Sequence, residues 1–220
     1  MKRNKMSQKE IFIKEEGDKW FERNLITQNL KSNTEDPVFK IIKELKLDYN
    51  SVLEVGCSNG YRLNYLKKNG AKLYGIDPSK KAIDYGLKNF ENLMLSQGTA
   101  DQLNFEDDKF DLLIFGFCLY LVDKEDLFKV SSEANRVLKN NGTIIIYDFE
   151  PTKEYFKEYH HKKGVLTHKM DYSKMFTWSQ NYFLSYKKIF NHDKHISDIL
   201  EEDSRVSVNI LVKTNDIHRK

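Results

Sequence analysis

The sequence contains few cysteines and no pattern of metal ligands. Among its 220 residues there are two cysteines, Cys57 and Cys118, and each lies at the end of an apolar stretch that we expect to be a strand. No cluster of cysteine and histidine has the spacing of metal ligands. We therefore expect two small buried thiols and no metal site.

Long apolar runs and an excess of one charge are also missing. The 36 Lys+Arg and 33 Asp+Glu residues leave a formal net charge of +3, spread along the chain, which does not indicate a nucleic-acid partner. No run approaches the roughly 18 apolar residues of a membrane span, and the polar first ten residues lack the apolar centre of a secretory signal. We expect a cytoplasmic protein, most simply a single domain with enough length to bury a sizeable core.

The most informative stretch is residues 52–60, VLEVGCSNG, followed by residues 61–66. A short apolar run contains the carboxylate of Glu54, two glycines four positions apart follow, and an amphipathic helix begins immediately afterwards. This pattern is typical of a strand that leads into a ligand-binding turn, where Gly56 and Gly60 let the backbone approach a ligand. The pattern E-x-G-x-x-x-G lacks the middle glycine of the dinucleotide fingerprint G-x-G-x-x-G, which disfavours a nicotinamide oxidoreductase.

Strands and helices alternate after this turn. We expect a helix from Asp36-Pro37, a second that ends near residues 69–70, and a third at 124–138. We expect strands at 71–77, 92–98, 143–149, 182–190 and 205–212, and a buried strand with its loop at 110–123. This alternation predicts an α/β fold with a doubly wound, mostly parallel sheet and helices on both faces.

Ligands of such sheets bind at the carboxyl ends of the strands. Glu54 with its turn, Asp77, Asp101 and residues 115–116 are all expected at that edge. Asp77 ends the second strand, where a carboxylate can accept hydrogen bonds from both hydroxyls of a ribose. The alternative is that Asp77 caps the helix beginning near residue 79.

Residues 52–60, 75–79, 98–102, 110–123 and 138–147 together resemble the small-molecule branch of the class I S-adenosylmethionine (AdoMet)-dependent methyltransferases, the methyltransferase domain type 11. The resemblance covers residues 36–149. It implies a Rossmann-like sheet of seven strands with an antiparallel last strand. It also implies AdoMet as cofactor, with S-adenosylhomocysteine as its product.

The resemblance also implies a set of binding residues. Gly56, Ser58 and Gly60 would line the methionine part of AdoMet, Asp101 with Gln102 the adenine, and Phe115 and Tyr120 the sulfonium. The full cofactor-binding set that we predict is Trp20, Arg23, Glu54, Gly56, Cys57, Ser58, Gly60, Asp77, Pro78, Ala100, Asp101, Gln102, Phe115 and Tyr120. Many relatives have histidine at the position of Tyr120, so a general-base role for this tyrosine is left open.

The N-terminal segment allows two interpretations. We expect residues 1–9 to be disordered and residues 10–34 to be helical, forming a cap over residues 36–220. Trp20 and Phe21 pack on the sheet edge in one interpretation; in the other the segment is a lid with Arg23 facing a carboxylate. Residues 16–24, EGDKWFERN, resemble a segment of methyltransferases encoded among bacterial surface-glycan genes, which implies a sugar or phospho-alcohol acceptor.

The acceptor side of the reaction is expected in residues 152–181, as a substrate-loop insertion. Methyl transfer needs a general base only if the acceptor is an alcohol or a protonated amine. We expect a helix at 152–161 above the binding edge, with His160, His161 and, further on, His168 as candidate bases. The alternative is a solvated helix face. Local basic charge in this region favours a phosphorylated small-molecule substrate.

The leading interpretation is methyl transfer from AdoMet to oxygen or nitrogen of a small metabolite. The alternatives are an RNA methyltransferase and a non-catalytic AdoMet-binding protein. The near-neutral charge argues against an RNA substrate. The sequence GFCL at residues 116–119 also argues against it, because an Asn-Pro-Pro-Tyr type signature would be expected at this place. Both a monomer and a homodimer are compatible with the sequence.

Overall fold

The computed structural model describes residues 6–30, 36–68, 70–193 and 201–214. Seven strands form one sheet in the order β3-β2-β1-β4-β5-β9-β8. Their bounds are β1 (Ser51–Val55), β2 (Lys72–Asp77), β3 (Leu93–Gln97), β4 (Phe110–Gly116), β5 (Leu138–Phe149), β8 (Tyr182–Asn191) and β9 (Arg205–Lys213). Strands β1 to β5 pair in parallel, and β9 pairs antiparallel with both β5 and β8. The predicted fold, with an antiparallel last strand, is therefore confirmed.

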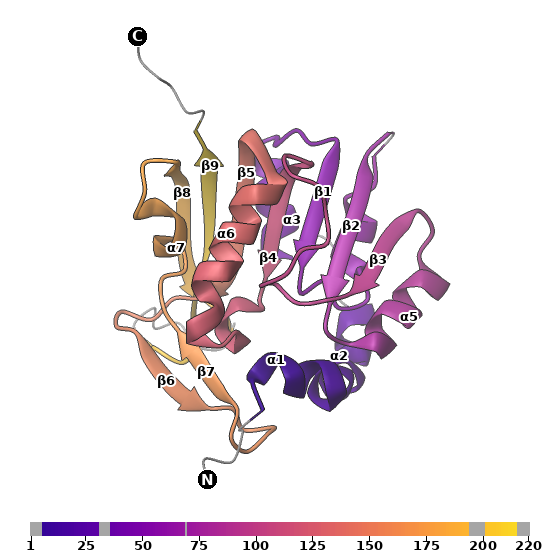
Figure 1. Cartoon of the computed structure of the whole chain (residues 1–220), viewed down its shortest axis with the longest axis vertical. Helices are drawn as coiled ribbons and strands as arrows, with labels where there is room; N and C mark the ends of the chain where they lie inside the picture. The colour runs from indigo at the N-terminus through magenta and orange to yellow at the C-terminus, as the bar shows by residue number, and fades with distance from the viewer. Residues whose placement is uncertain (1–5, 31–35, 69, 194–200, 215–220) are drawn as a thin grey trace.

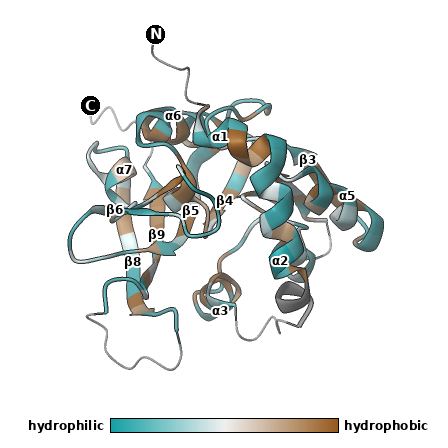
Figure 2. Cartoon of the chain, turned by 90° about the horizontal axis from the view of Figure 1, so that it is seen from below, coloured by the Kyte–Doolittle hydropathy of each residue, from teal (hydrophilic) through white to brown (hydrophobic). Residues whose placement is uncertain are grey.

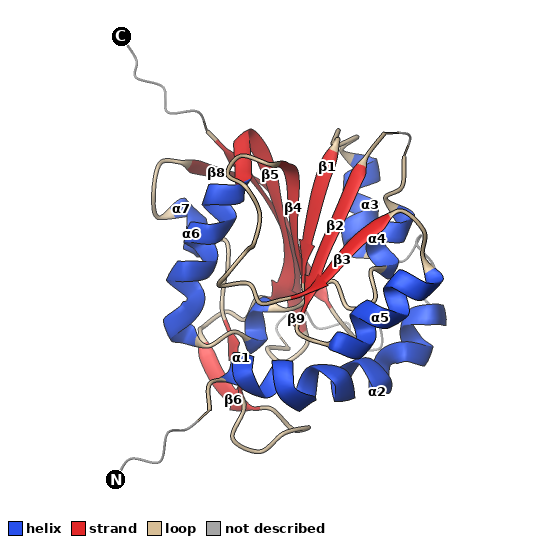
Figure 3. Cartoon of the chain, turned by 45° about the vertical axis from the view of Figure 1, so that its right-hand side comes forward, coloured by secondary structure: helices blue, strands red, loops and turns tan. Residues whose placement is uncertain are grey.

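Helices cover both faces of the sheet and one end of its strands (Figures 1 and 3). The helices are α1 (Gln8–Ile11), α2 (Gly17–Leu30), α3 (Pro37–Glu44), α4 (Tyr61–Tyr65), α5 (Lys80–Asn89), α6 (Leu127–Val137) and α7 (Lys174–Thr177). The π-helical turn η1 (Phe12–Glu16) joins α1 to α2, and the short turns η3 (Leu119–Leu121) and η4 (Lys124–Asp126) precede α6. Helices α3, α4 and α5 pack on one face and α6 and α7 on the other, whereas α1 and α2 lie across the strand ends.

The central strands are apolar toward both faces, as expected of a buried parallel sheet. Along β1, Val52 faces the cluster under α3 to α5 and Leu53 faces the cluster under α6. In β4, Leu112 and Leu113 repeat this alternation. Successive side chains of a strand point to opposite faces, so a continuous apolar run supplies both layers of the core.

Two helix boundaries follow from local chemistry. Helix α3 begins where the sequence predicts, because Asp36 Oδ1 accepts the N–H groups of Val38 and Phe39, each at 3.0 Å, and Pro37 takes the first helical position. Helix α4, in contrast, ends at Tyr65 and does not continue to residues 69–70. The N–H of Leu66 closes a tighter turn on the carbonyl of Leu63, which ends the helix early.

The predicted helix at 152–161 is wrong. Residues in this range form β6 (Tyr155–Glu158), which pairs antiparallel with β7 (Leu166–Lys169) in a second, two-stranded sheet. The side-chain period is two, since Tyr155 and Lys157 both reach Asp203. The segment 164–178, which has no clear period in the sequence, contains β7 and α7.

Other differences lie at segment ends. The structure shows order where residues 1–9 were expected to be disordered: Ser7 and Glu10 form a capping box that starts α1, and residues 1–5 lie outside the described residues. Strand β5 begins at Leu138, before the expected residue 143, and Asn141 adopts a φ of 62° within it. The expectations for residues 31–34, 194–200 and 215–220 also lie outside the described residues.

Candidate functional site

A cavity of about 750 Å³ lies at the carboxyl ends of β1, β2 and β4. This volume is within the range of about 300–1,000 Å³ that is usual for small-molecule sites. Seen from below, the strand ends lie between α2 on one side and β8 on the other, with α3 beside them (Figure 2). We call the two ends of the cavity the α2 end and the β8 end. The α2 end is lined by Lys9, Trp20, Asp77, Asp101 and Leu121, and the β8 end by Tyr61, Tyr147, Tyr186, Phe190 and His192.

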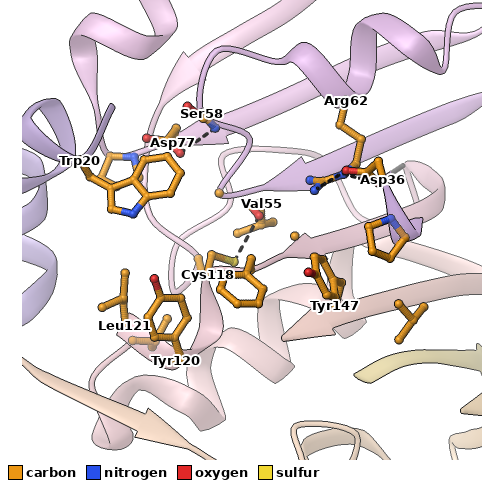
Figure 4. A pocket seen from close by; sticks show the side chains of 18 of the residues that line it. Trp20, Asp36, Val55, Ser58, Arg62, Asp77, Cys118, Tyr120, Leu121 and Tyr147 are labelled. Atoms are coloured by element: carbon orange, nitrogen blue, oxygen red, sulfur yellow. Dashed lines mark hydrogen bonds and ion pairs between the residues drawn. The ribbon is translucent and has the colours of Figure 1, made fainter. Parts of the chain in front are cut away.

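The turn after β1 forms the middle of the cavity wall (Figure 4). Gly56 has a φ of +72°, and a Cβ on it would lie 2.5 Å from the Cβ of Cys118, closer than side-chain carbons can approach. Cys118 donates its Sγ–H to the carbonyl of Val55 at 3.2 Å. Because Cys118 covers the turn so closely, glycine is required at position 56 for steric as well as conformational reasons.

Asp77 is held by the same turn. Its Oδ2 accepts the backbone N–H of Ser58 and its Oδ1 that of Ser79, both at 2.8 Å. Burial raises the pKa of Asp77 to about 6. Helix α5 is capped by Ser79, whose Oγ accepts the N–H of Ala82 at 3.0 Å. Asp77 therefore lies at the cavity wall and is not the cap of that helix.

The α2 end contains an ion pair that joins the N-terminal segment to the sheet. The Nζ of Lys9 lies 2.5 Å from Oδ2 of Asp101 and 3.0 Å from Oδ2 of Asp126. The hydrogen bond to Asp101 raises the pKa of Lys9. Sequence reasoning missed Lys9, because it falls in the polar stretch expected to be disordered. Its one sequence signal is the Ser7 and Glu10 capping box that places it on a helix.

Glu54 lies beneath the cavity and does not line it. It is fully buried and forms an ion pair with Arg62, whose Nη2 lies 3.0 Å from Oδ2 of Asp36. Burial raises the pKa of Glu54 to about 7; burial also acts on Asp36, but the charge of Arg62 brings its pKa below the usual range. A Cβ on Gly116 would collide with Nη1 of Arg62 and lie 2.9 Å from Oε1 of Glu54. The end of β4 must therefore be glycine where it crosses this pair.

Asp148, which sequence reasoning missed, fixes the loop after β4. Its Oδ2 accepts the N–H of Leu119 and its Oδ1 that of Phe149, both at 2.8 Å. Burial raises the pKa of Asp148 to about 7. The loop begins at Phe117, which has a φ of 69° and lines the cavity. A carboxylate inside the apolar run 143–149 is the signal that could have identified it.

Comparison with known proteins finds a family that matches the middle of the chain. Residues 53–146 match the family described as "Methyltransferase domain". The demethylmenaquinone methyltransferase of Staphylococcus saprophyticus is 32% identical over 127 residues, which cover 54% of this chain and 54% of that protein. An uncharacterised methyltransferase of Synechocystis is 32% identical over 97 residues, or 44% of this chain and 46% of that protein. Residues 53–146, which carry the turn after β1, Asp77 and Asp101, therefore match a methyltransferase domain.

A solved structure matches this chain along almost its whole length. This is the 1,6-didemethyltoxoflavin-N1-methyltransferase of Burkholderia thailandensis with bound 1,6-didemethyltoxoflavin and S-adenosylhomocysteine. The TM-score is 0.73 at 10% identity, over 98% of this chain and 93% of that one, so the likeness shows the fold. The chain spans about half the length of the two curated relatives described above.

The structure places part of the predicted binding set on the cavity. The lining includes Trp20, Gly56, Ser58, Asp77, Pro78, Ala100, Asp101 and Tyr120. Tyr120 is buried, which raises the pKa of its hydroxyl, and that hydroxyl is hydrogen-bonded to Trp20. A phenol with a raised pKa stays protonated at neutral pH, so Tyr120 is suited to donate a hydrogen bond.

Other members of the predicted set do not line the cavity. They are Arg23, Glu54, Cys57, Gly60, Gln102 and Phe115. Arg23 is paired with Glu16 at 2.6 Å and lies 3.3 Å from the hydroxyl of Tyr159. Phe115 is a fully buried residue of the core beneath α6 and α7.

The three predicted histidines are also away from the cavity. His160 and His161 are exposed in the turn that follows β6, since the helix expected to carry them over the strand ends is absent. His168 is buried in β7, where its Nε2 lies 2.9 Å from Oε1 of Glu154 and its ring stacks on Phe156. Sequence reasoning instead missed His192, which lines the β8 end.

Proposed function

We propose that this chain transfers the methyl group of AdoMet to an oxygen or nitrogen atom of a small-molecule acceptor. One observation carries the proposal: a single cavity joins Asp77 and the Gly56 turn at the strand ends to an aromatic chamber at β8. A donor and an acceptor can therefore occupy one continuous space, as a direct displacement requires.

The residues at the α2 end fit the nucleoside of AdoMet. Asp77 and Asp101 provide carboxylate oxygens for hydroxyl and amine donors, and Trp20 and Leu121 provide apolar surface for a base. Cys118 packs on Gly56 and the Arg62–Glu54 pair packs on Gly116, which fixes the backbone that lines the cavity at these two positions. We assign the ribose to Asp77 and the adenine to Asp101, which the Lys9 ion pair neutralises in part.

AdoMet, when bound, supplies a methyl group on an already activated leaving group. The chain has to hold the acceptor in line with that methyl group, exclude water and accept a proton when the acceptor is an alcohol or a protonated amine. The loop from Phe117 to Tyr120 lines the cavity and is held by hydrogen bonds to Asp148, which supports the positioning role.

We also propose that residues 1–35 form a cap over the α2 end. Several contacts support it: Asp18 accepts the hydroxyl hydrogen of Ser79 at 2.7 Å, and Glu22 forms an ion pair with Lys81. The backbone N–H of Gln8 donates to Asp123 at 2.8 Å, on the other side of the cavity. The cap therefore spans the α2 end from α5 to the loop before α6 (Figure 1).

The sequence prediction of a phosphorylated sugar or other surface-glycan building block is one proposal for the acceptor. Lys40 and Lys188, which line the β8 end of the cavity, support it as anchors for a phosphate. Among the described residues, no helix has both the length and the hydropathy to cross a bilayer. The cytoplasmic location and the oligomeric state stay predictions.

Isothermal titration calorimetry and a turnover assay test the proposal together. We expect saturable binding of AdoMet and of S-adenosylhomocysteine, no binding of NADH, and transfer of label from methyl-labelled AdoMet to a small acceptor. Asp84→Asn is the matched control for Asp77→Asn, because Asp84 is exposed on α5 and paired with Lys80. Binding without transfer to any small molecule would favour an AdoMet sensor, and transfer to RNA would contradict a small acceptor.

A further inference from the structure

Lys9 lies at the α2 end of the cavity with two carboxylate partners. Its Nζ is 2.5 Å from Oδ2 of Asp101 and 3.0 Å from Oδ2 of Asp126. An ammonium group has three N–H donors, and the part of the chain that the structure describes offers this one no third acceptor within hydrogen-bond distance. Lys9 lines the cavity, and 35% of its side chain is exposed, against 12% for Asp101. One N–H donor is therefore available to a ligand in the cavity.

The backbone that carries Lys9 is anchored by the residue before it. Gln8 is buried and donates its backbone N–H to Asp123 at 2.8 Å and its side-chain amide to the carbonyl of Leu121 at 3.0 Å. The side-chain oxygen of Gln8 accepts the backbone N–H of Leu166 in β7. Adjacent residues of a helix move together, so these bonds hold Lys9 at the cavity.

Asp101 is suited to accept a hydrogen bond beside this ammonium group. Burial acts to raise the pKa of Asp101, but hydrogen bonds from Lys9 and from the Thr99 side chain bring it below the usual value. The carboxylate is therefore ionised at neutral pH. A carboxylate has about four acceptor positions, so an amino group of a ligand can still donate to Asp101 while Lys9 and Thr99 remain bonded to it.

The backbone donors that follow Asp101 in the chain are already engaged. Gln102 donates its N–H to the carbonyl three residues before it at 3.3 Å, and Leu103 donates its N–H to Oε2 of Glu133 at 2.8 Å. A ligand atom that needs a donor next to the Asp101 carboxylate is therefore met by the ammonium group of Lys9.

We propose that Lys9 and Asp101 together recognise the Watson–Crick edge of adenine, with Asp101 accepting the 6-amino group and Lys9 donating to N1. The inference rests on the proposed AdoMet-dependent activity, in which Asp101 is assigned to the adenine. Along this edge adenine has a donor, the 6-amino group, next to an acceptor, N1. A carboxylate next to an ammonium group has the complementary order. Lys9 is thus a residue that selects adenine as well as one that ties the N-terminal segment to the sheet.

Two analogues of S-adenosylhomocysteine test this assignment by isothermal titration calorimetry on the full chain. The 1-deaza analogue has a C–H group in place of N1. The 3-deaza analogue is the control, because it has a C–H group in place of N3 and keeps both N1 and the amine. We expect the wild type to bind the 1-deaza analogue about 10–100-fold more weakly than S-adenosylhomocysteine, since a hydrogen bond from a charged donor is lost, and the 3-deaza analogue with little change. Equal affinities for the two analogues would overturn the proposal.

A variant separates recognition of N1 from a structural role of the ion pair. Lys9→Met should bind S-adenosylhomocysteine about 10–100-fold more weakly than the wild type, and it should no longer distinguish this ligand from the 1-deaza analogue. Lys14→Met is the matched control and should keep the wild-type Kd values, since Lys14 is exposed on η1 and does not line the cavity.

The possible outcomes separate this proposal from the proposed function. If Lys9→Met binds more weakly but keeps the wild-type preference over the 1-deaza analogue, Lys9 is structural and the proposal is overturned. The analogue series on the wild type decides the proposal even if the variant does not fold. Absence of S-adenosylhomocysteine binding to the wild type would overturn the proposed function as well.

Discussion

Gly116→Ala is the substitution that the geometry of the site opposes most strongly. The added Cβ would collide with Nη1 of Arg62 and lie 2.9 Å from Oε1 of Glu54. Both side chains are buried and ion-paired, so neither can move into solvent to make room. The variant must either shift the end of β4 or separate the pair.

The expected loss of stability follows from these two routes. Overpacking a buried position by one carbon costs about 1–3 kcal/mol, and breaking a buried ion pair costs about 3–5 kcal/mol. We expect Gly116→Ala to lower the free energy of unfolding by about 3 kcal/mol. With a urea m-value of about 2 kcal/mol per molar, the midpoint falls by roughly 1.5 M. The AdoMet affinity should fall too, because Gly116 lines the cavity.

Gly98→Ala is the matched control for this measurement. A Cβ on Gly98 would meet only carbons of Ile76, at 3.7–3.9 Å, which is ordinary van der Waals contact. Alanine there should change the free energy of unfolding by less than about 1 kcal/mol, and it can stabilise by restricting the unfolded chain. Urea unfolding followed by circular dichroism measures both variants. Equal urea midpoints for the wild type and Gly116→Ala would refute the close packing of Gly116 on the Arg62–Glu54 ion pair.

Three further predictions concern the carboxylates and the histidines. Asp77→Asn should weaken AdoMet binding by about 10–100-fold in calorimetry, since one acceptor of a hydroxyl bond is lost. Asp148 has a folded-state pKa raised to about 7 by burial, so the stability it contributes is fully present below about pH 4 and lost as the pH rises through about 7. Urea unfolding across this pH range should show the free energy of unfolding of the wild type falling by up to about 4 kcal/mol relative to that of Asp148→Asn. If the free energies of the two proteins change in parallel with pH, the raised pKa is contradicted. His160→Ala and His161→Ala should each keep full turnover, because both side chains lie outside the cavity; a large loss would restore them as candidate bases.

The sheet was predictable because its signals are local and redundant. An unbroken apolar run such as that of β4 satisfies two faces of a buried parallel strand at once, and the glycines after β1 mark a turn that no other residue fits. Asp77 followed from its place at a strand end. The sequence order of strands then determines which edge gathers the ligand-binding residues.

The acceptor side was not predictable, because its contacts join segments far apart in the chain. Residues 155–158 have no strong period, and their strand conformation depends on pairing with β7 and on contacts with Asp203. Lys9 meets Asp101 across 92 residues of sequence, and Tyr147 meets His192 across 45. Propensity and pattern carry no information on such pairs, so the sequence did not place Lys9 or His192 at the cavity.

A crystal structure of the chain with S-adenosylhomocysteine tests the central claim most directly. We expect the nucleoside in the cavity between Trp20 and the Gly56 turn, with its ribose hydroxyls on Asp77 and its sulfur directed toward the β8 end. A nucleoside bound elsewhere on the molecule, or a ribose that does not contact Asp77, would contradict it.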